Sequence, residues 1–235
     1  GTLLHLNSVF NNEQPPPLIS FSLGSLGFLT PFEFGDWKPI LELILDAHIH
    51  PVRITIRMRI LCEVYRKGQT ETSESVFTVM NEVLVDRGGQ PYLSSIELFV
   101  DGEHITTVAA DGILISTPTG STAYSMSAGG AMVSPSIGAI LLTPICPHSL
   151  SFRPIILPDT SVVELVVPET SRSSVWVSFD GRNRLELLKG DSLVMYSSEK
   201  PLTTIKTKPF NLEWFQSIQQ KLHWNIRETQ KPFQS

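Results

Sequence analysis

The chain has 235 residues, of which 41% are hydrophobic and 17% are charged, a composition typical of a folded protein with one large core or two smaller ones. Its formal charge of -5 gives no excess of cations for a nucleic-acid backbone, which argues against a nucleic-acid partner. The two cysteines, Cys62 and Cys146, form no C-x-x-C pair, so we expect neither a disulfide framework nor a structural zinc site. We expect Cys146 to be a small buried apolar residue.

No apolar run approaches the roughly 20 residues that span a bilayer, and no basic segment followed by an apolar one opens the chain. The sequence therefore predicts a soluble protein with no membrane partner, which we assign to the cytoplasm. An organellar form stays open, because the chain begins with Gly1 rather than Met and has the character of a fragment.

The first fifty residues have the pattern of an α/β domain. Residues 2–10 are typical of a helix, and the short apolar run 18–23 predicts a buried parallel strand. A glycine-bearing turn follows at residues 24–31. A helix is then expected over residues 32–47, where apolar side chains recur at helical spacing, namely Ile40, Leu43, Ile44 and Ala47.

From Val52 the apolar residues alternate, which predicts one long strand over residues 52–64 with a solvent-facing side. Further strands separated by turn residues are predicted at 76–85, 96–100, 105–108, 140–143, 162–167, 175–179, 185–188 and 193–196. A helical insertion is expected at residues 121–132, and the apolar face of residues 211–222 indicates a helix that packs back on a core.

The predicted fold class is therefore α/β plus all-β. A partial, Rossmann-like α/β domain would occupy residues 1–50, and an antiparallel β-sandwich domain would occupy residues 51–200. The C-terminal segment, residues 201–235, would return its helix to the first domain.

A hydroxyl-rich segment at residues 116–125 follows a predicted strand and leads into the predicted helical insertion. Backbone N–H groups at a helix start have no intrahelical partners, so with the hydroxyls of Ser121 and Thr122 they could bind a phosphate or a base edge. An ordinary N-cap is the alternative, because Ser and Thr precede helices routinely.

Asn81 and Glu82 lie inside an apolar strand pattern. Neighbours in a strand point to opposite faces, so at least one of them must face a core or a cleft, where it needs polar partners. Glu82 could accept hydrogen bonds from both hydroxyls of a ribose, and Asn81 could pair with an adenine edge. Alternatively, one faces solvent and the other ends a strand.

Three Asp-Gly pairs occur in the chain. Hairpin turns explain Asp101-Gly102 and Asp180-Gly181 without a ligand, whereas Asp111 directly precedes the strand that leads to the hydroxyl-rich segment. His48 and His50 have no metal-ligand spacing, so we expect no metal site, and His148 is expected to order a loop.

Five segments taken together resemble NAD kinase in its eukaryotic form. They are residues 23–30, 81–88, 111–124, 144–154 and 177–182, in the same order as in that family and over nearly the whole chain. The resemblance implies transfer of the γ-phosphoryl group of ATP, with Mg²⁺, to the 2′-hydroxyl of the adenosine ribose of NAD. It also implies a homodimer or homotetramer in which a neighbouring subunit contributes to the NAD site.

The resemblance carries specific residues onto this chain. Asn81 and Glu82 would hold the adenosine half of NAD, and Asp111 would reach a ribose or the nicotinamide end, in one subunit or the next. Phe28 would wall the pocket from the α/β side. The remaining substrate-binding residues that the resemblance implies are Gly1, Thr119, Ser121, Thr122, Ala123, Tyr124, Ser127 and Asp180.

In that family a Gly-Gly-Asp-Gly motif precedes the helix that begins here at Thr2, and this chain has only its last glycine, Gly1. We therefore expect the general-base aspartate to lie upstream and this chain alone to be inactive. A noncatalytic dinucleotide-binding subunit stays open. A lipid kinase of related architecture or a β-sandwich recognition module is disfavoured by the nucleotide-type residues and the α/β opening.

Overall fold

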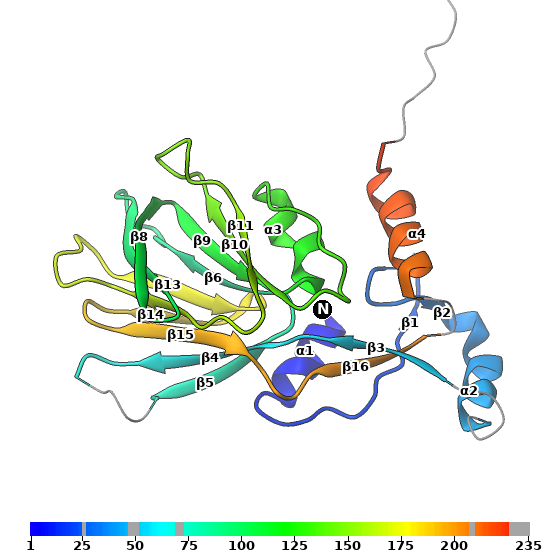
Figure 1. Ribbon diagram of the computed structural model, residues 1–235. Coiled ribbons are helices and arrows are strands. Elements are labelled where there is room, and N and C mark those ends of the chain that lie inside the picture. Colours follow the sequence, from blue (N-terminus) through cyan, green and yellow to red (C-terminus); the bar gives the residue numbers. More distant parts are fainter. Residues whose placement is uncertain (25–26, 47–51, 69–72, 207–209, 226–235) are drawn as a thin grey trace, which may run out of the picture. The chain divides into compact units, whose positions relative to one another are not determined.

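The computed structural model describes residues 1–24, 27–46, 52–68, 73–206 and 210–225 (Figure 1). The chain divides into two compact units. Unit 1 contains residues 1–16 and 56–203, and unit 2 contains residues 17–55 and 204–235.

Unit 1 is a β-sandwich of two six-stranded sheets, which Figure 1 shows as two layers. The first sheet has the order β5 (Ser75–Val79), β4 (Ile60–Tyr65), β15 (Ser192–Ser197), β12 (Val163–Val166), β7 (Ser94–Val100), β8 (Glu103–Ala110). The second has the order β11 (Ile155–Pro158), β10 (Ala139–Ile145), β9 (Gly112–Ser116), β6 (Glu82–Asp86), β13 (Val175–Phe179), β14 (Arg182–Leu187). Neighbouring strands are antiparallel in both sheets, which confirms the predicted sandwich.

One apolar core lies between the two layers, as the alternation along the strands requires. In β6, for example, Val83 and Val85 are fully buried in this core, so Glu82 and Leu84 lie on the opposite face of the sheet. Burying an aliphatic side chain of this size stabilises the fold by about 1.5–3 kcal/mol. The core therefore fixes which side chains of β6 can reach a ligand.

Unit 2 carries the α/β part of the fold. Strand β1 (Phe21–Ser22) pairs in parallel with β2 (Phe32–Glu33), and η1 (Phe34–Asp36) and α2 (Trp37–Leu45) follow β2. The helix α4 (Phe210–Leu222) belongs to the same unit. A separate two-stranded sheet consists of β3 (Arg53–Arg57) and β16 (Leu202–Lys206). The mixed α/β plus all-β class is confirmed.

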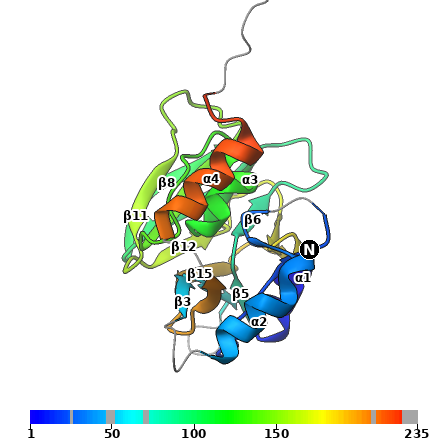
Figure 2. The same cartoon turned by 90° about the vertical axis from the view of Figure 1, so that its right-hand side faces the viewer.

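Helix α1 (Thr2–Val9) belongs to the sandwich unit rather than to unit 2. It packs against β5, beside which it lies in Figures 1 and 2, and the amide of Asn7 donates to the carbonyl oxygen of Thr78 at 2.8 Å. The domain bounds 1–50, 51–200 and 201–235 stay a prediction.

Two predicted strands are each broken into two. The long strand expected over residues 52–64 is interrupted at Met58 and Arg59, because the buried Arg59 guanidinium turns inward to donate to carbonyl oxygens of Asn11 and Glu13. The strand expected over residues 76–85 ends at Val79, because the chain there leaves one sheet for the other.

The expected helix over residues 121–132 is also wrong in its extent. Only η2 (Thr119–Thr122) and the single turn α3 (Tyr124–Ser127) form. Gly129 has φ 86°, a left-handed conformation that ends the turn, and the Ser121 hydroxyl then accepts from the N–H of Val133 at 2.9 Å.

Near the N-terminus the elements are shorter than predicted. Strand β1 covers only two half-buried residues of the run 18–23, and the helix expected from Phe32 begins at Trp37, because residues 32–33 pair with β1. Ala47 lies outside the described residues. Strands β11 and β16 were not predicted.

Turn chemistry was predicted more successfully than helix length. Asp101 and Gly102 have φ 52° and 83° between β7 and β8, and Asp180 and Gly181 have φ 50° and 70° between β13 and β14, which confirms both hairpin turns. Cys146, in contrast, is exposed and has φ 45°, because it stands where the chain turns after β10. Its predicted burial is therefore wrong.

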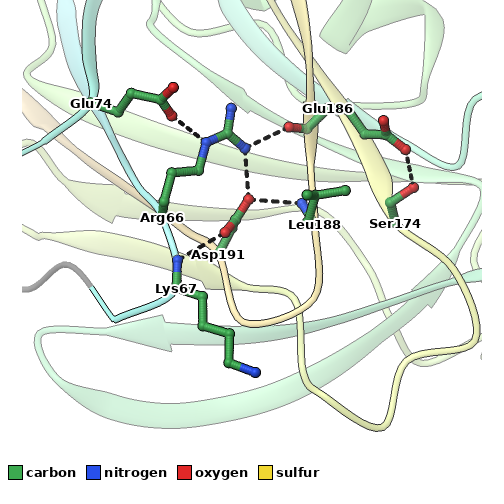
Figure 3. A network of polar contacts seen from close by, with 7 residues as sticks. All are labelled: Arg66, Lys67, Glu74, Ser174, Glu186, Leu188 and Asp191. Atoms are coloured by element: carbon green, nitrogen blue, oxygen red, sulfur yellow. Dashed lines mark hydrogen bonds and ion pairs between the residues drawn. The ribbon is translucent and has the colours of Figure 1, made fainter.

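A polar cluster closes the end of β4, and Figure 3 shows its members. Asp191, which is 2% exposed, accepts from the Arg66 Nη1 at 2.6 Å and from the backbone N–H groups of Lys67 at 3.0 Å and Leu188 at 2.8 Å. The same Arg66 Nη1 donates to the carbonyl oxygen of Glu186 in the other sheet at 2.7 Å. We call Arg66, Lys67, Glu186, Leu188 and Asp191 the Asp191 cluster; it joins the two sheets.

Candidate functional site

The chain turns sharply where β5 gives way to β6, and one carboxylate holds the turn. Asp180, 8% exposed, accepts from the backbone N–H of Met80 at 2.9 Å, of Asn81 at 2.7 Å and of Glu82 at 3.2 Å. Three consecutive donors on one carboxylate fix the backbone of this turn. We call residues Met80, Asn81 and Glu82 the Glu82 corner.

Helix α1 contributes to the same place through Asn7, its buried residue. The side-chain amide of Asn7 donates to Asp180 Oδ2 at 3.3 Å, and its oxygen accepts from Arg59 Nη1 at 3.1 Å. Sequence reasoning missed Asn7. The available signal was a polar residue three and four positions after Leu4 and Leu3, on the apolar face of a helix.

The hydroxyl-rich segment lies directly against the Glu82 corner. The N–H of Thr117 donates to the carbonyl oxygen of Asn81 at 2.9 Å. A Cβ atom on Gly120 would lie 2.1 Å from that same oxygen, so only glycine permits this approach. The structure therefore brings the predicted polar pair and the predicted hydroxyl-rich segment together.

Glu82 is the electrostatic centre of the site. Burial raises its pKa to about 7, the nearby Asp180 charge acts in the same direction, and a hydrogen bond from the backbone N–H of Tyr124 opposes both. Among the described residues, Glu82 Oε2 is buried without a hydrogen-bond partner. A carboxyl group in this state can accept a hydrogen bond from a ligand hydroxyl.

Ser116 stands opposite Glu82 in the β6–β9 pair, so the two side chains lie on the same face of the sheet. Its hydroxyl is also buried, with no hydrogen-bond partner within the described part of the chain. The sequence placed Ser116 in the hydroxyl-rich segment 116–125 but did not select it as a site residue. Only the register between β6 and β9 reveals that it faces Glu82.

The hydroxyls of the segment serve mainly to hold its own shape. Ser121 is fully buried and donates to the carbonyl oxygen of Pro118 at 2.7 Å, and Thr122 donates to that of Thr119 at 3.4 Å. Thr119 accepts from Arg57 Nη1 at 3.2 Å. Pro118 and Ala123 provide no side-chain cap for η2 or α3, but Thr117 Oγ1 accepts from the backbone N–H of Gly120 at 3.1 Å, as the ordinary capping alternative describes.

A cleft of about 510 Å³ opens beside α3 on the same face of the second sheet. Asp111 and Tyr124, both predicted site residues, line it together, and Arg87 Nε donates to Asp111 Oδ1 at 2.8 Å. The other lining residues are Leu84, Asp86, Arg87, Gly88, Gly89, Ile145 and Arg184. Arg87, which sequence reasoning also missed, holds one oxygen of Asp111.

The remaining predicted residues are placed as follows. Ala123 is half-buried between η2 and α3, and Ser127 is exposed at the end of α3. Gly1 precedes α1, and its carbonyl oxygen accepts from Arg182 Nη2 at 3.3 Å. Phe28 belongs to unit 2, so its contact with the pocket stays a prediction.

Within the described residues, no three His, Cys, Asp or Glu side chains gather closely enough to hold a metal ion. His48 and His50 lie outside those residues. The backbone N–H of His148 donates to the carbonyl oxygen of Ala109 at 2.9 Å, in line with its expected role in a loop. No helix in the described part of the chain has the length and apolar character needed to cross a membrane.

In this β-sandwich the hydroxyl-rich segment contacts the Glu82 corner at Gly120. The sequence of this region matches a known domain family. The profile of the ATP-NAD kinase C-terminal domain matches residues 80–207, which include every predicted site residue except Gly1 and Phe28. The chain therefore belongs to the NAD kinase family, as its eukaryotic-type motifs predicted.

Three similar proteins place the chain further. It is 48% identical, over 98% of its length, to NAD kinase 2, chloroplastic, of Arabidopsis thaliana, and 44% identical, over 99% of its length, to the NAD(+) kinase of Saccharomyces cerevisiae. A crystal structure of yeast NADH kinase complexed with NADH matches with a TM-score of 0.87 and 38% identity, over 98% of this chain and 66% of that one. The chain spans 24% of the plant relative and 45% of the yeast relative.

Proposed function

We propose that the protein is an NAD kinase, which transfers the γ-phosphoryl group of ATP to the 2′-hydroxyl of the adenosine ribose of NAD. Two findings support this proposal. The matching domain family is the ATP-NAD kinase C-terminal domain, and the similar plant and yeast proteins are named NAD kinases. Mg²⁺ would accompany ATP and offset charge on its phosphates. The cytoplasmic assignment remains part of the proposal.

The observation that carries the proposal is the unsatisfied, buried Oε2 of Glu82. Leaving a buried polar atom unpaired costs about 1–3 kcal/mol, so a fold retains one where a ligand supplies the partner. A ribose hydroxyl is such a partner, since it can donate to a carboxylate and accept from a neighbouring hydroxyl or amide. Asn81, held at the same corner, would meet the adenosine end.

The cleft of about 510 Å³ beside α3 would hold the rest of the dinucleotide. Tyr124 spans both regions, because its backbone N–H contacts Glu82 and its residue lines the cleft with Asp111. A dinucleotide could therefore run from the Glu82 corner towards Asp111. Thr122, Ala123 and Ser127 would line that path, and a second subunit in a homodimer or homotetramer would complete it.

The proposal is tested with the full-length protein, incubated with ATP, Mg²⁺ and either NAD or NADH, and followed by an NADP-specific dehydrogenase assay. Glu82→Gln should reduce NADP formation strongly, whereas Glu103→Gln, the same change at the exposed start of strand β8, should not. NAD binding by a wild-type protein that forms no NADP or NADPH would instead identify a noncatalytic binding subunit. Analytical ultracentrifugation gives the oligomeric state.

A further inference from the structure

The carboxylate of Asp180 is fully occupied by the protein itself. Its two oxygens receive the N–H groups of Met80, Asn81 and Glu82 and the side-chain amide of Asn7. A carboxylate offers roughly four acceptor positions, and these four donors fill them. Asp180 was expected to contact substrate directly, but this arrangement suits a residue that acts through its neighbours.

Asn7 is held as firmly as Asp180. The guanidinium of Arg59, which has no exposed surface, donates to Asn7 Oδ1, and its remaining bonds go to backbone carbonyl oxygens of Asn11, Glu13 and Lys200. Burial lowers the pKa of Arg59 to about 10, which still leaves it protonated at neutral pH. A buried chain of hydrogen bonds therefore runs from Arg59 through Asn7 and Asp180 to the Glu82 corner, and it connects α1 to β6.

We propose that Asp180 and Asn7 are positioning residues for the dinucleotide: Asp180 fixes the backbone of Asn81 and Glu82, and Asn7 fixes the Asp180 carboxylate. This inference rests on the proposed function, because the ligand that Glu82 and Asn81 meet is the dinucleotide. Asp180 has a second effect, since its charge lies close enough to Glu82 to disfavour ionisation there. Asp180 therefore holds Glu82 in place and adds to the rise in the pKa of Glu82 that burial mainly causes.

The groups around Glu82 make the sign of this effect clear. Tyr124 offers a neutral N–H from α3 and Ser116 a neutral hydroxyl from β9, whereas Asp180 brings a negative charge from the β13–β14 turn. The cation Arg59 contacts Asn7 on α1. Removing the Asp180 charge should therefore lower the pKa of Glu82.

The test compares three variants of the full-length protein: Asp180→Asn, Asn7→Asp and, as a matched control, Asp191→Asn. Asp191 is also a buried carboxylate that accepts backbone N–H groups, but it lies in the Asp191 cluster at the other end of β4. The dissociation constant for NAD is measured by calorimetry over a range of pH. Hydrogen exchange of the peptide containing residues 80–82 is measured by mass spectrometry without ligand.

Asp180→Asn should weaken NAD binding by about 10- to 100-fold, the cost of a displaced contact, and should move the pH midpoint of binding downwards. Asn7→Asp, which keeps a partner for Arg59 but replaces the donor to Asp180 with a like charge, should weaken binding by about 3- to 10-fold. Both should speed exchange of residues 80–82. The control should leave affinity, midpoint and exchange of that peptide at wild-type values.

The inference is overturned if Asp180→Asn and Asn7→Asp both keep the wild-type midpoint and exchange rates, or if Asp191→Asn changes them equally. If wild-type protein binds neither NAD nor NADH, the proposed function fails separately, and the exchange of residues 80–82 still decides the positioning role. Should Asp180→Asn not fold, faster exchange of residues 80–82 in Asn7→Asp supports the inference, and wild-type exchange there overturns it.

Discussion

Two arginines flank strand β4, and they differ in the groups that surround their positive charge. Arg66, after β4, pairs directly with the carboxylate of Asp191, so cation and anion neutralise each other. Arg59, before β4, meets carbonyl oxygens and Asn7 instead, and the nearby carboxylate of Asp180 meets N–H groups. At the C-terminal end of β4, cation and anion form an ion pair. Near its N-terminal end, Arg59 and Asp180 form no ion pair with each other, and Glu82 Oε2 has no hydrogen-bond partner among the described residues.

Buried carboxylates therefore have two different surroundings in one sandwich. In the Asp191 cluster, charge pairing and backbone donors join the sheets. At the Glu82 corner, a second carboxylate keeps Glu82 partly protonated near neutral pH, because burial and the Asp180 charge both raise its pKa, to about 7. Satisfied polar groups stabilise the fold, whereas the unpaired Glu82 Oε2 supports the binding site that we propose at this corner.

The largest effect on stability is expected from removing Asp191 at the C-terminal end of β4. Asp191→Ala removes the acceptor of the backbone N–H groups of Lys67 and Leu188, while Arg66 keeps Glu74 as a partner. The free energy of unfolding should therefore fall by about 1.5–3 kcal/mol for each of these two charge-assisted hydrogen bonds. Urea denaturation of the full-length protein measures this. Glu169→Ala is the control, because its pair with Lys67 is exposed and should contribute less than about 1 kcal/mol. Equal losses in both variants would contradict the assignment of Asp191 as the stabilising partner.

Removing the Glu82 side chain at the Glu82 corner should change enzyme activity rather than stability. Glu82→Ala removes the predicted ribose partner, and kcat/KM for NAD should fall by about 100-fold, close to 2.7 kcal/mol of transition-state binding. The unfolding free energy should hardly change, because the lost carboxylate has an unpaired oxygen. Coupled assays of NADP formation, with Glu103→Ala as the control, check this; unchanged kcat/KM would remove Glu82 from the site.

Sequence patterns predicted the sandwich well, because a period of two over many segments has few other interpretations. They failed where one long-range contact overrides the local pattern. The alternation from Val52 to Val64 runs through Arg59 without a sign that its guanidinium turns inward. The apolar run around Asn81 likewise hides a change of sheet that depends on Asp180, 99 positions away.

The site was predictable in part for the same reason. Asn81, Glu82 and the segment around Gly120 were selected because polar and glycine residues interrupt apolar patterns, and the structure brings them together. Ser116 and Asn7 were not selected, since one depends on strand register and the other on helix packing. The Ser121 hydroxyl was assigned to a ligand, but its bonds go to Pro118 and Val133.

A smaller effect concerns pH and sharpens the contrast between the two ends of β4. The pKa of Glu82 is raised in the folded state from 4.5 to about 7, so the folded protein binds one proton more than the unfolded chain between these values. Stability from this group is therefore present at low pH and is lost as pH rises through about 7. Glu82→Gln should remove that loss and stabilise the protein at about pH 8 by roughly 1 kcal/mol, as urea titrations at two pH values would show.

The smallest effect is expected at the cleft, where Asp111 is paired with an arginine, like Asp191, but is partly exposed. Asp111 Oδ1 lies 2.8 Å from Arg87 Nε, but both side chains are partly exposed, Asp111 at 37% and Arg87 at 34%. Arg87→Ala should therefore cost less than about 1 kcal/mol in stability.

The same change frees the Asp111 carboxylate to turn away from the cleft, so NAD affinity should fall by about 3- to 10-fold, the loss of one oriented polar contact. Lys189→Ala, which removes an exposed cation outside the cleft, is the control for the change in net charge. Calorimetry at low and high salt separates the two explanations. A loss of affinity that Lys189→Ala reproduces, and that salt abolishes, would mean that Arg87 acts through its charge alone and does not orient Asp111.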